Sequence, residues 1–180
     1  MIIGLTGRKY SGKTTAAEAL EGLGFEPQSF AWTLKMLARI LMRDVGLTEQ
    51  QIVEAQLHKE QAIPLLGVSF RYLCQTLGTE WGRTHIHPDV WVMAAAHKVP
   101  PSQLVVFDDV RFENEAAMIR KRGGLIIHIK RPLHRETDNH ASEAGIAFVE
   151  GDELVMNAGS KDDFIEAVFD IGLRFKQHVG

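Results

Sequence analysis

A short run near the start of the chain carries residues that together could bind phosphate. The run Gly7-Arg8-Lys9-Tyr10-Ser11-Gly12-Lys13-Thr14 fits the phosphate-binding loop pattern G-x-x-x-x-G-K-[ST]. In such a loop the glycines let the backbone curl, so that successive N–H groups point at phosphates from the positive end of the following helix. Lys13 would then reach the β- and γ-phosphates of a nucleoside triphosphate, and the Thr14 hydroxyl would hold Mg²⁺. We predict a triphosphate site formed by Gly7, Ser11, Gly12, Lys13, Thr14 and Thr15.

Two acidic residues follow an apolar run later in the chain. The run Leu104-Val105-Val106-Phe107 predicts a buried strand, and Asp108 and Asp109 come directly after it. In phosphate-loop proteins a carboxylate at the end of such a strand lies beside the Mg²⁺. Adjacent strand residues face opposite ways, so we expect one aspartate to face the metal and the other to cap a helix or orient a neighbour. Spacing from the strand alone would select Asp108 as the aspartate that faces the metal.

Arginines come after two of the predicted strands. Arg111 follows the acidic pair, at the start of a predicted helix. A cation at the start of a helix is unfavourable without an anion nearby, so we expect a second phosphate to lie beside Arg111. Arg131 follows the apolar run 125–129, and Arg135 would share a face with it if this segment is helical. We expect both to clamp a transferring phosphoryl group from a mobile lid at about 131–146. A plain surface loop is the alternative for this polar stretch.

A segment in the middle of the chain mixes cations and an amide with aromatic residues. Its Arg71, Gln75 and Arg83 suit the phosphate and base of a nucleotide, although each would also be an ordinary group on a helix surface. His85 and His87 would share one face of a strand, if a strand formed there. No Cys or His stands at zinc-site spacing from them, so a structural role is preferred to a metal site.

The order of predicted elements places these residues in one α/β domain. Apolar runs predict strands at 1–6, 25–30, 104–107, 125–129 and 153–156, with helices at 14–20, 113–122 and 162–177. Residues 32–99 are mostly helical in pattern and form an insertion, with Thr48 as the N-cap of one helix. We expect a core at about 1–31 and 100–180 with a three-layer α/β/α fold and a five-stranded parallel sheet. Right-handed crossovers gather the loops after the strands at one edge, where ligands bind.

Composition limits the classes of protein to consider. A chain of 180 residues without a low-complexity stretch predicts a single domain. A formal net charge of −3 disfavours a nucleic acid polymer as partner, and no apolar run approaches the ~18 residues that a membrane span needs. The single cysteine, Cys74, excludes an internal disulfide framework and is interpreted as a small buried hydrophobe. Because strand-like sequence begins at Met1, we expect no signal peptide and a cytoplasmic protein.

Several of these segments together resemble the phage-type deoxynucleoside monophosphate kinases, a branch of the nucleoside monophosphate kinase group with a phosphate-loop fold. The matching pieces are Gly7 to Thr14, Ser29-Phe30-Ala31 with Lys35, Gln75 to Arg83 with Gly78-Thr79-Glu80, Asp89 with Trp91, Asp109-Val110-Arg111-Phe112 with Glu115, and His140-Ala141-Ser142-Glu143. They span nearly the whole chain, and the Gly-Thr-Glu and Asp-Val-Arg-Phe segments are the specific ones. The loop residues Arg8-Lys9-Tyr10 depart from the small residues common in such loops.

The resemblance implies roles for individual residues. It makes Lys13, Thr14 and their neighbours the holders of ATP and Mg²⁺, and it prefers Asp109 to Asp108 as the acid beside the metal. It places the segment Asn157-Ala158-Gly159-Ser160 against the adenine, with Asn157 and Gly159 as donor-binding residues. The residues that it implies for the acceptor nucleotide are Lys35, Arg71, Gln75, Thr79, Glu80, Arg83, Trp91, Arg111 and Glu115.

The reaction that the resemblance implies is ATP plus a deoxynucleoside monophosphate giving ADP and the diphosphate. The acceptor phosphate is mostly dianionic at neutral pH, because its second pKa is near ~6, and it needs no strong general base. Two polyanions must instead be brought together by cations, here Lys13, Arg111, Arg131 and Arg135 with Mg²⁺. The expected partner is therefore a small-molecule nucleotide, and an apolar helix face in the insertion could serve a homodimer.

Two other functions stay open at this point. A kinase of a hydroxyl group, of the dephospho-coenzyme A or sugar kinase type, would need a base such as Asp108 or Glu80. A nucleotide-dependent switch would hydrolyse its triphosphate slowly without an acceptor. Guanine-specific switches usually carry an Asn-Lys-x-Asp motif, and the segment Asn157-Ala158-Gly159-Ser160 does not match it.

Overall fold

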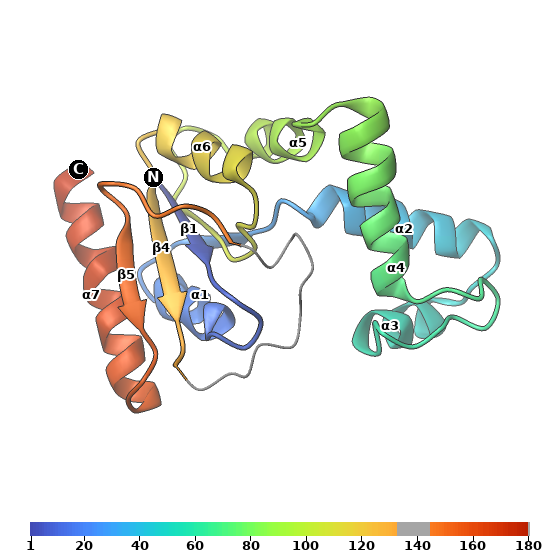
Figure 1. Ribbon diagram of the computed structural model, residues 1–180, viewed down its shortest axis with the longest axis horizontal. Helices are drawn as coiled ribbons and strands as arrows, with labels where there is room; N and C mark the ends of the chain where they lie inside the picture. The colour runs from blue at the N-terminus through green and yellow to red at the C-terminus, as the bar shows by residue number, and fades with distance from the viewer. Residues whose placement is uncertain (133–144, 180) are drawn as a thin grey trace. The chain divides into compact units, whose positions relative to one another are not determined.

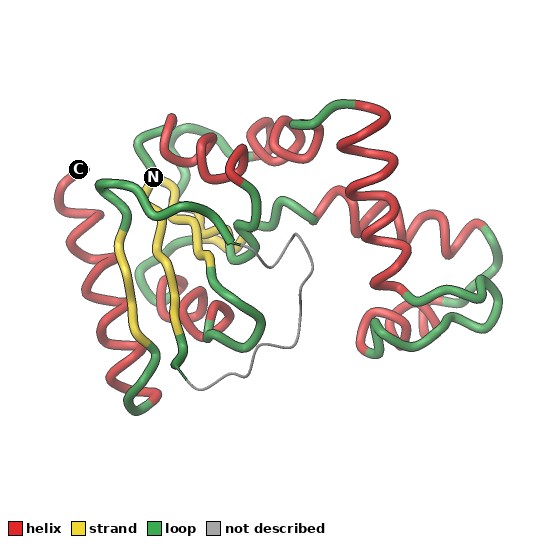
Figure 2. The backbone as a smooth tube through the Cα atoms, in the orientation of Figure 1, coloured by secondary structure: helices red, strands yellow, loops and turns green. Residues whose placement is uncertain are grey.

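Strands and helices alternate along most of the chain, with a run of helices after the second strand (Figures 1 and 2). The computed structural model describes residues 1–132 and 145–179. The strands are β1 (Ile2–Thr6), β2 (Glu26–Gln28), β3 (Val105–Phe107), β4 (Leu125–Lys130) and β5 (Glu153–Met156). The helices are α1 (Lys13–Glu21), α2 (Trp32–Asp44), α3 (Glu49–Leu57), α4 (Phe70–Gln75), η1 (Thr76–Ile86), α5 (Val90–Lys98), α6 (Glu113–Lys121) and α7 (Lys161–Val179). The predicted lid, including Arg135, lies mostly outside the described residues.

The strands form one parallel sheet in the order β2-β3-β1-β4-β5. Ile3 of β1 lies opposite Val106 of β3 on one side and Leu125 of β4 on the other. In Figure 1, β4 and β5 lie side by side and point the same way. The predicted five-stranded parallel sheet is confirmed. Its strand ends bring the loops after β1, β3, β4 and β5 to one edge.

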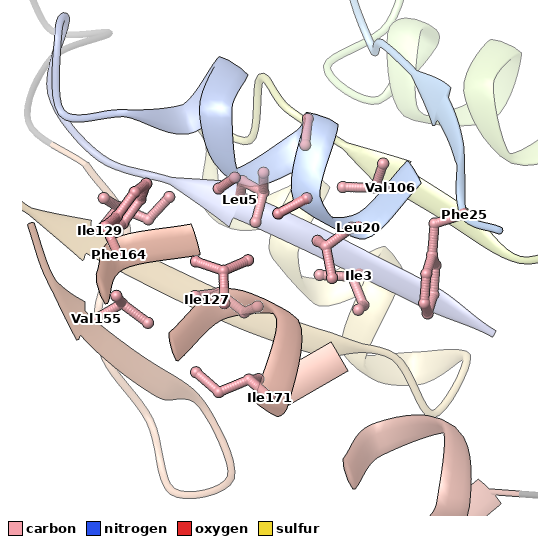
Figure 3. Packing of buried hydrophobic residues seen from close by; sticks show 14 residues of the cluster. Ile3, Leu5, Leu20, Phe25, Val106, Ile127, Ile129, Val155, Phe164 and Ile171 are labelled. Atoms are coloured by element: carbon pink, nitrogen blue, oxygen red, sulfur yellow. The ribbon is translucent and has the colours of Figure 1, made fainter. Parts of the chain in front are cut away.

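Helices cover both faces of this sheet. Figure 3 shows Ile3, Leu5 and Ile127 of the strands packed with Leu20 of α1 and Phe164 of α7 on one face. On the other face, Ile119 of α6 comes so close to Gly4 of β1 that an added Cβ would meet its Cδ1 at 2.6 Å. The strands β1 and β3 are buried over their whole length and β4 over most of it, which explains their continuous apolar runs. The predicted three-layer α/β/α architecture is therefore confirmed.

The chain forms two compact units, of which the sheet and its helices belong to the first. Unit 1 comprises residues 1–30 and 96–180, and unit 2 comprises residues 31–95. Unit 2 is helical and has its own core, made by Ala38, Met42, Leu47, Ile52, Ile63 and Phe70. Thr48 caps α3 as predicted: its side chain accepts from the N–H of Gln51, whose side chain accepts in turn from the Thr48 N–H.

One helix of unit 2 departs from the expected pattern. Residues Thr76–Ile86 form a π-helix, η1, which continues directly from α4. This finding excludes the strand on which His85 and His87 would have shared a face, because His85 lies in η1 and His87 ends it. Among the described residues there is no cluster of three or more His, Cys, Asp or Glu that could hold a metal ion by itself.

Within residues 1–132 and 145–179, every helix is too short or too polar to cross a bilayer.

Candidate functional site

The phosphate-binding loop joins β1 to α1 through residues 7–12. Gly12, the last of them, has φ +113°, a left-handed conformation that glycine adopts without strain. A Cβ at this position would lie 2.7 Å from Nδ2 of Asn157. The loop is closed internally by a hydrogen bond from the N–H of Ser11 to the carbonyl of Arg8, 3.1 Å long. The backbone therefore makes the tight curl that the sequence pattern indicates, directly before the N-terminus of α1.

Lys13 begins α1 and folds back over the loop. Its Nζ donates to the carbonyl oxygens of Gly7 and Arg8, at 2.6 and 2.9 Å. Thr14 is exposed in the first turn of α1, and Thr15 after it is half-buried. The Ser11 hydroxyl is buried and has no hydrogen-bond partner among the described residues. An ammonium held over the loop and an exposed threonine hydroxyl suit the two roles predicted for Lys13 and Thr14.

Asn157, at the end of β5, braces the loop from the side. Its Nδ2 donates to the carbonyl of Ser11 at 2.8 Å, and its backbone N–H donates to the carbonyl of Lys130 at 2.7 Å. Gly159 lies two residues further on, where a Cβ would be 3.1 Å from a carboxylate oxygen of Asp163. The segment predicted to lie against the adenine thus contacts the loop directly through Asn157.

The acidic pair follows β3, the neighbour of β1 in the sheet. Asp109 is fixed by two hydrogen bonds, accepting from the Ser29 hydroxyl at 2.6 Å and from the Phe30 N–H at 2.9 Å. Asp108 precedes it and is half-buried. Mg²⁺ prefers hard oxygen ligands, commonly one or two carboxylates together with phosphates and water. Asp108 and Asp109 after β3 and the Thr14 hydroxyl in α1 are oxygen donors of this kind, so their chemistry fits a magnesium ion.

Arg111 lies on the short connection from β3 to α6, and Glu115 lies in the first turn of α6. The buried carboxylate of Glu115 accepts from the backbone N–H groups of Arg111 at 2.8 Å and Phe112 at 3.1 Å. Glu115 therefore fixes the backbone that carries the exposed Arg111 side chain. This role differs from the contact with the acceptor nucleotide that the resemblance implies for Glu115, which stays a prediction.

A cavity of about 470 Å³ lies in unit 1 at the ends of β1 and β4. Its charged lining consists of five cationic side chains, from Arg8, Lys9, Arg111, Lys130 and Arg131. No carboxylate lines it among the described residues. Thr6, Gly7 and Ser11 of the loop and His128 of β4 complete its polar wall. Such a concentration of cations in a chain whose formal net charge is −3 favours a polyanionic ligand.

His128 is held in that wall by a buried ion-pair network. Its Nε2 lies 2.9 Å from Oδ2 of Asp152, which also accepts from Arg120 of α6 at 2.6 Å. Burial would raise the pKa of Asp152, but hydrogen bonds from Arg120, His128 and the Val149 N–H outweigh it and hold the pKa below its ordinary value. No local sequence pattern indicates this network, because Arg120 and His128 are 32 and 24 residues away from Asp152. Lys130 is a further cation of the cavity that the sequence did not predict, although it adjoins Arg131 at the end of β4.

The acceptor residues that the resemblance implies lie mostly in unit 2. Lys35 is exposed on α2, whereas Arg71, Gln75, Thr79, Glu80 and Arg83 follow one another along α4 and η1. Arg71 pairs with Glu60, with Nε and Oε1 2.6 Å apart. Trp91 of α5 is buried, and its Nε1 donates to the carbonyl of Gly78.

Cys74 of α4 behaves as the sequence analysis expects. It is a free thiol, and burial raises its pKa to about 11, against a smaller opposing effect of Lys35. A thiol with this pKa is almost entirely protonated at neutral pH, which disfavours Cys74 as a nucleophile.

Comparison with known proteins identifies related sequences. Residues 35–168 match the family model described as deoxynucleotide monophosphate kinase. A protein of Acanthamoeba polyphaga mimivirus, provisionally named a deoxynucleotide monophosphate kinase, is 34% identical over 172 residues, covering 87% of each chain. The deoxynucleoside-5'-monophosphate kinase of Escherichia phage T5 is 27% identical over 131 residues, or 68% of this chain. The deoxynucleotide monophosphate kinase of Enterobacteria phage T4 is 28% identical over 105 residues, or 56% of this chain.

The relatives differ in how much of their own length is matched. The alignment spans 87% of the mimivirus protein but 49% of the phage T5 protein and 44% of the phage T4 protein.

Proposed function

Because this chain belongs to the deoxynucleotide monophosphate kinase family, we propose that it transfers the γ-phosphoryl group of ATP to the phosphate of a deoxynucleoside monophosphate, with Mg²⁺. The family indicated by the motifs is confirmed, and with it the assignment of the chain as an enzyme that phosphorylates deoxynucleoside monophosphates. The donor, the metal and the roles of individual residues belong to the proposal.

One observation supports the proposal more than any other: the cavity beside the phosphate loop carries five cations and, among the described residues, no carboxylate. In-line transfer between two phosphates demands neutralisation of charge rather than removal of a proton, because the acceptor oxygen is already ionised at neutral pH. A hydroxyl acceptor would instead need a base beside it. The lining thus favours a phosphate acceptor over the sugar or dephospho-coenzyme A type of kinase.

The residues of the loop and the cavity then take distinct roles. Lys13, now held by the carbonyls of Gly7 and Arg8, would exchange those partners for the β- and γ-phosphates. Arg111 and Arg131 would stabilise the charge that spreads over the transferring group. Thr14 and one aspartate of the acidic pair would hold Mg²⁺, which would supply further neutralisation of the donor phosphates. The Glu115 carboxylate fixes the Arg111 backbone and so limits where that guanidinium can reach.

The experiment is an ADP-release assay with ATP and Mg²⁺ across the common ribo- and deoxyribonucleoside monophosphates. We expect ADP formation to depend on an added monophosphate. ADP release that depends on a sugar or on dephospho-coenzyme A, and not on a monophosphate, would contradict the proposed reaction. Slow ADP release that no acceptor accelerates would also contradict it and would indicate a switch protein.

Substitution tests the roles of the cations. Lys13→Ala or Arg131→Ala should lower kcat about a hundredfold, because each removes a cation that acts mainly in the transition state, and should change acceptor affinity much less. Lys121→Ala is the matched control, since this exposed lysine ends α6 and does not line the cavity. Near wild-type turnover of Lys13→Ala would refute its catalytic role.

A further inference from the structure

Burial along α4 and η1 recurs every fourth residue. Phe70, Gly78 and Gly82 are the buried residues of these helices, and Cys74 between them is half-buried like its neighbours, so the most buried positions are spaced in multiples of four residues. An α-helix has 3.6 residues per turn, so steps of four would turn such a row by ~40° each. The i→i+5 hydrogen bonds of a π-helix give more than four residues per turn. Steps of four residues in η1 therefore turn the row around the helix axis in the opposite sense and offset the rotation accumulated in α4.

The same winding aligns a second row, one position further along. Arg71, Gln75, Thr79 and Arg83 are each the next residue after a member of the buried row. None of the four is fully buried, and Thr79 is exposed. In a continuous α-helix the first and last of them would be ~120° apart around the axis, after three steps of ~40°. With η1 wound as a π-helix, the four side chains stay on one face.

Trp91 of α5 contacts the middle of this π-helix through its indole. The side chain is 4% exposed, and its Nε1 donates to the carbonyl of Gly78 at 2.9 Å. A Cβ on Gly82 would lie 2.5 Å from Cζ2 of the ring, so the indole occupies space that any side chain at position 82 would need. In an α-helix the Gly78 carbonyl would be the partner of the Gly82 N–H, four residues on.

Hydrogen bonds on the far side of this contact run over five residues. The His87 N–H donates to the carbonyl of Gly82 at 2.9 Å, and the Thr84 hydroxyl donates to the carbonyl of Thr79 at 3.1 Å. A side chain inserted into the hydrogen-bond ladder of a helix is a known cause of such irregular winding. The Trp91 indole takes up the Gly78 carbonyl of this ladder, and the absence of a side chain at Gly82 leaves room for the ring.

We propose that the Trp91 indole, seated on Gly82 and bonded to the Gly78 carbonyl, keeps η1 in its π-helical winding and thereby aligns Arg71, Gln75, Thr79 and Arg83 to bind the acceptor nucleotide. Trp91 is then a positioning residue that acts through the helix and does not touch the base. This inference rests on the proposed function, because it specifies how the acceptor is held.

The test uses two substitutions that disturb the contact in different ways. Trp91→Phe keeps a ring but removes the N–H, and Gly82→Ala places a methyl group in the ring. We expect the acceptor KM to rise about five- to tenfold for Trp91→Phe, the loss expected for one buried hydrogen bond, and more for Gly82→Ala. The KM for ATP and kcat at saturating acceptor should change less than twofold. Amide hydrogen exchange of residues 78–87 should become faster, and calorimetry without ATP should show the same loss of acceptor affinity.

Controls separate this role from a general loss of stability. Tyr72→Phe is the matched control, because Tyr72 is 57% exposed on α4, which continues into η1, and has no predicted role in the site. Gly82→Ala should raise the acceptor KM by a smaller factor in a Trp91→Leu background, where the indole ring atoms are absent. This non-additivity would report the contact between Trp91 and Gly82 itself.

Three outcomes would overturn the inference. An acceptor KM within twofold of wild type for both Trp91→Phe and Gly82→Ala would refute the inference and leave the proposed function intact. Parallel rises in the KM values for acceptor and ATP would do the same. A wild-type protein with no monophosphate-dependent turnover would refute the proposed function and the inference together.

Discussion

Asp152 joins three segments of unit 1 through a single carboxylate. Its oxygens accept from Arg120 of α6, from His128 of β4 and from the N–H of Val149. The Asp152 side chain is 3% exposed, so its partners lose a desolvated counter-charge if it is removed. We predict that Asp152→Asn lowers the free energy of unfolding by about 3 kcal/mol at neutral pH, because it leaves the Arg120 charge without its buried partner.

The pH dependence of this contribution follows from the lowered pKa of Asp152. The carboxylate is more easily ionised in the folded protein than in the unfolded chain, so its stabilising effect is complete above the unfolded pKa of 3.8 and is lost as the pH falls through the lower folded value. Urea unfolding of wild type and Asp152→Asn at pH 7 and pH 3 measures this. The stability difference between the two proteins should shrink at the lower pH. A difference that is equal at both pH values would contradict the assignment, and Asp162→Asn, an exposed change in α7, is the control.

At the scale of the element, the phosphate loop depends on a residue far away in the sequence. Asn157 follows β5, yet its Nδ2 donates to the carbonyl of Ser11 and thereby holds the middle of the loop. We predict that Asn157→Ala raises the KM for ATP about five- to tenfold, since the loop N–H groups lose their fixed arrangement when this bond is lost. The acceptor KM serves as an internal control and should change little. An unchanged KM for ATP would show that the loop holds its shape without Asn157.

Most elements could be predicted from the sequence because their signals are local. Buried parallel strands give apolar runs, which placed β1, β3 and β4 close to their observed bounds. A threonine before a helical pattern, with a glutamine three residues on, correctly placed the start of α3 at Thr48. These patterns need no knowledge of the rest of the fold.

The π-helix η1 and the braces of the site could not be found in this way. The winding of η1 depends on an indole from α5, which meets Gly78 and Gly82 only in the folded unit. Likewise, Asp109 is fixed by Ser29, 80 residues away. The motif gave the residue types of the loop, but the partners that orient them come from tertiary contacts. The functional roles of these residues stay predictions.

At the scale of the whole molecule, the two nucleotides are predicted to be bound by residues of different units. The donor residues, from Gly7 to Thr15 with Asn157, belong to unit 1, and most acceptor residues implied by the resemblance belong to unit 2. Each unit has a hydrophobic core of its own. If the two cores unfold independently, a defect in one core should lower the affinity for one nucleotide and leave the affinity for the other unchanged.

Ile52 offers a test of this separation, because it is fully buried in the core of unit 2 with Ala38, Met42 and Phe70. We predict that Ile52→Ala costs about 2–5 kcal/mol of local stability, through lost burial and the cavity left behind. Hydrogen exchange should then become faster in residues 31–95 and remain unchanged in β1, β3 and β4. The acceptor KM should rise, whereas the affinity for ATP, measured by calorimetry without acceptor, should stay within twofold of wild type. Val53→Ala is the matched control, since this neighbour on α3 is 47% exposed and its truncation opens no cavity. Equal losses of affinity for ATP and acceptor in Ile52→Ala would mean instead that the two cores unfold as one cooperative system.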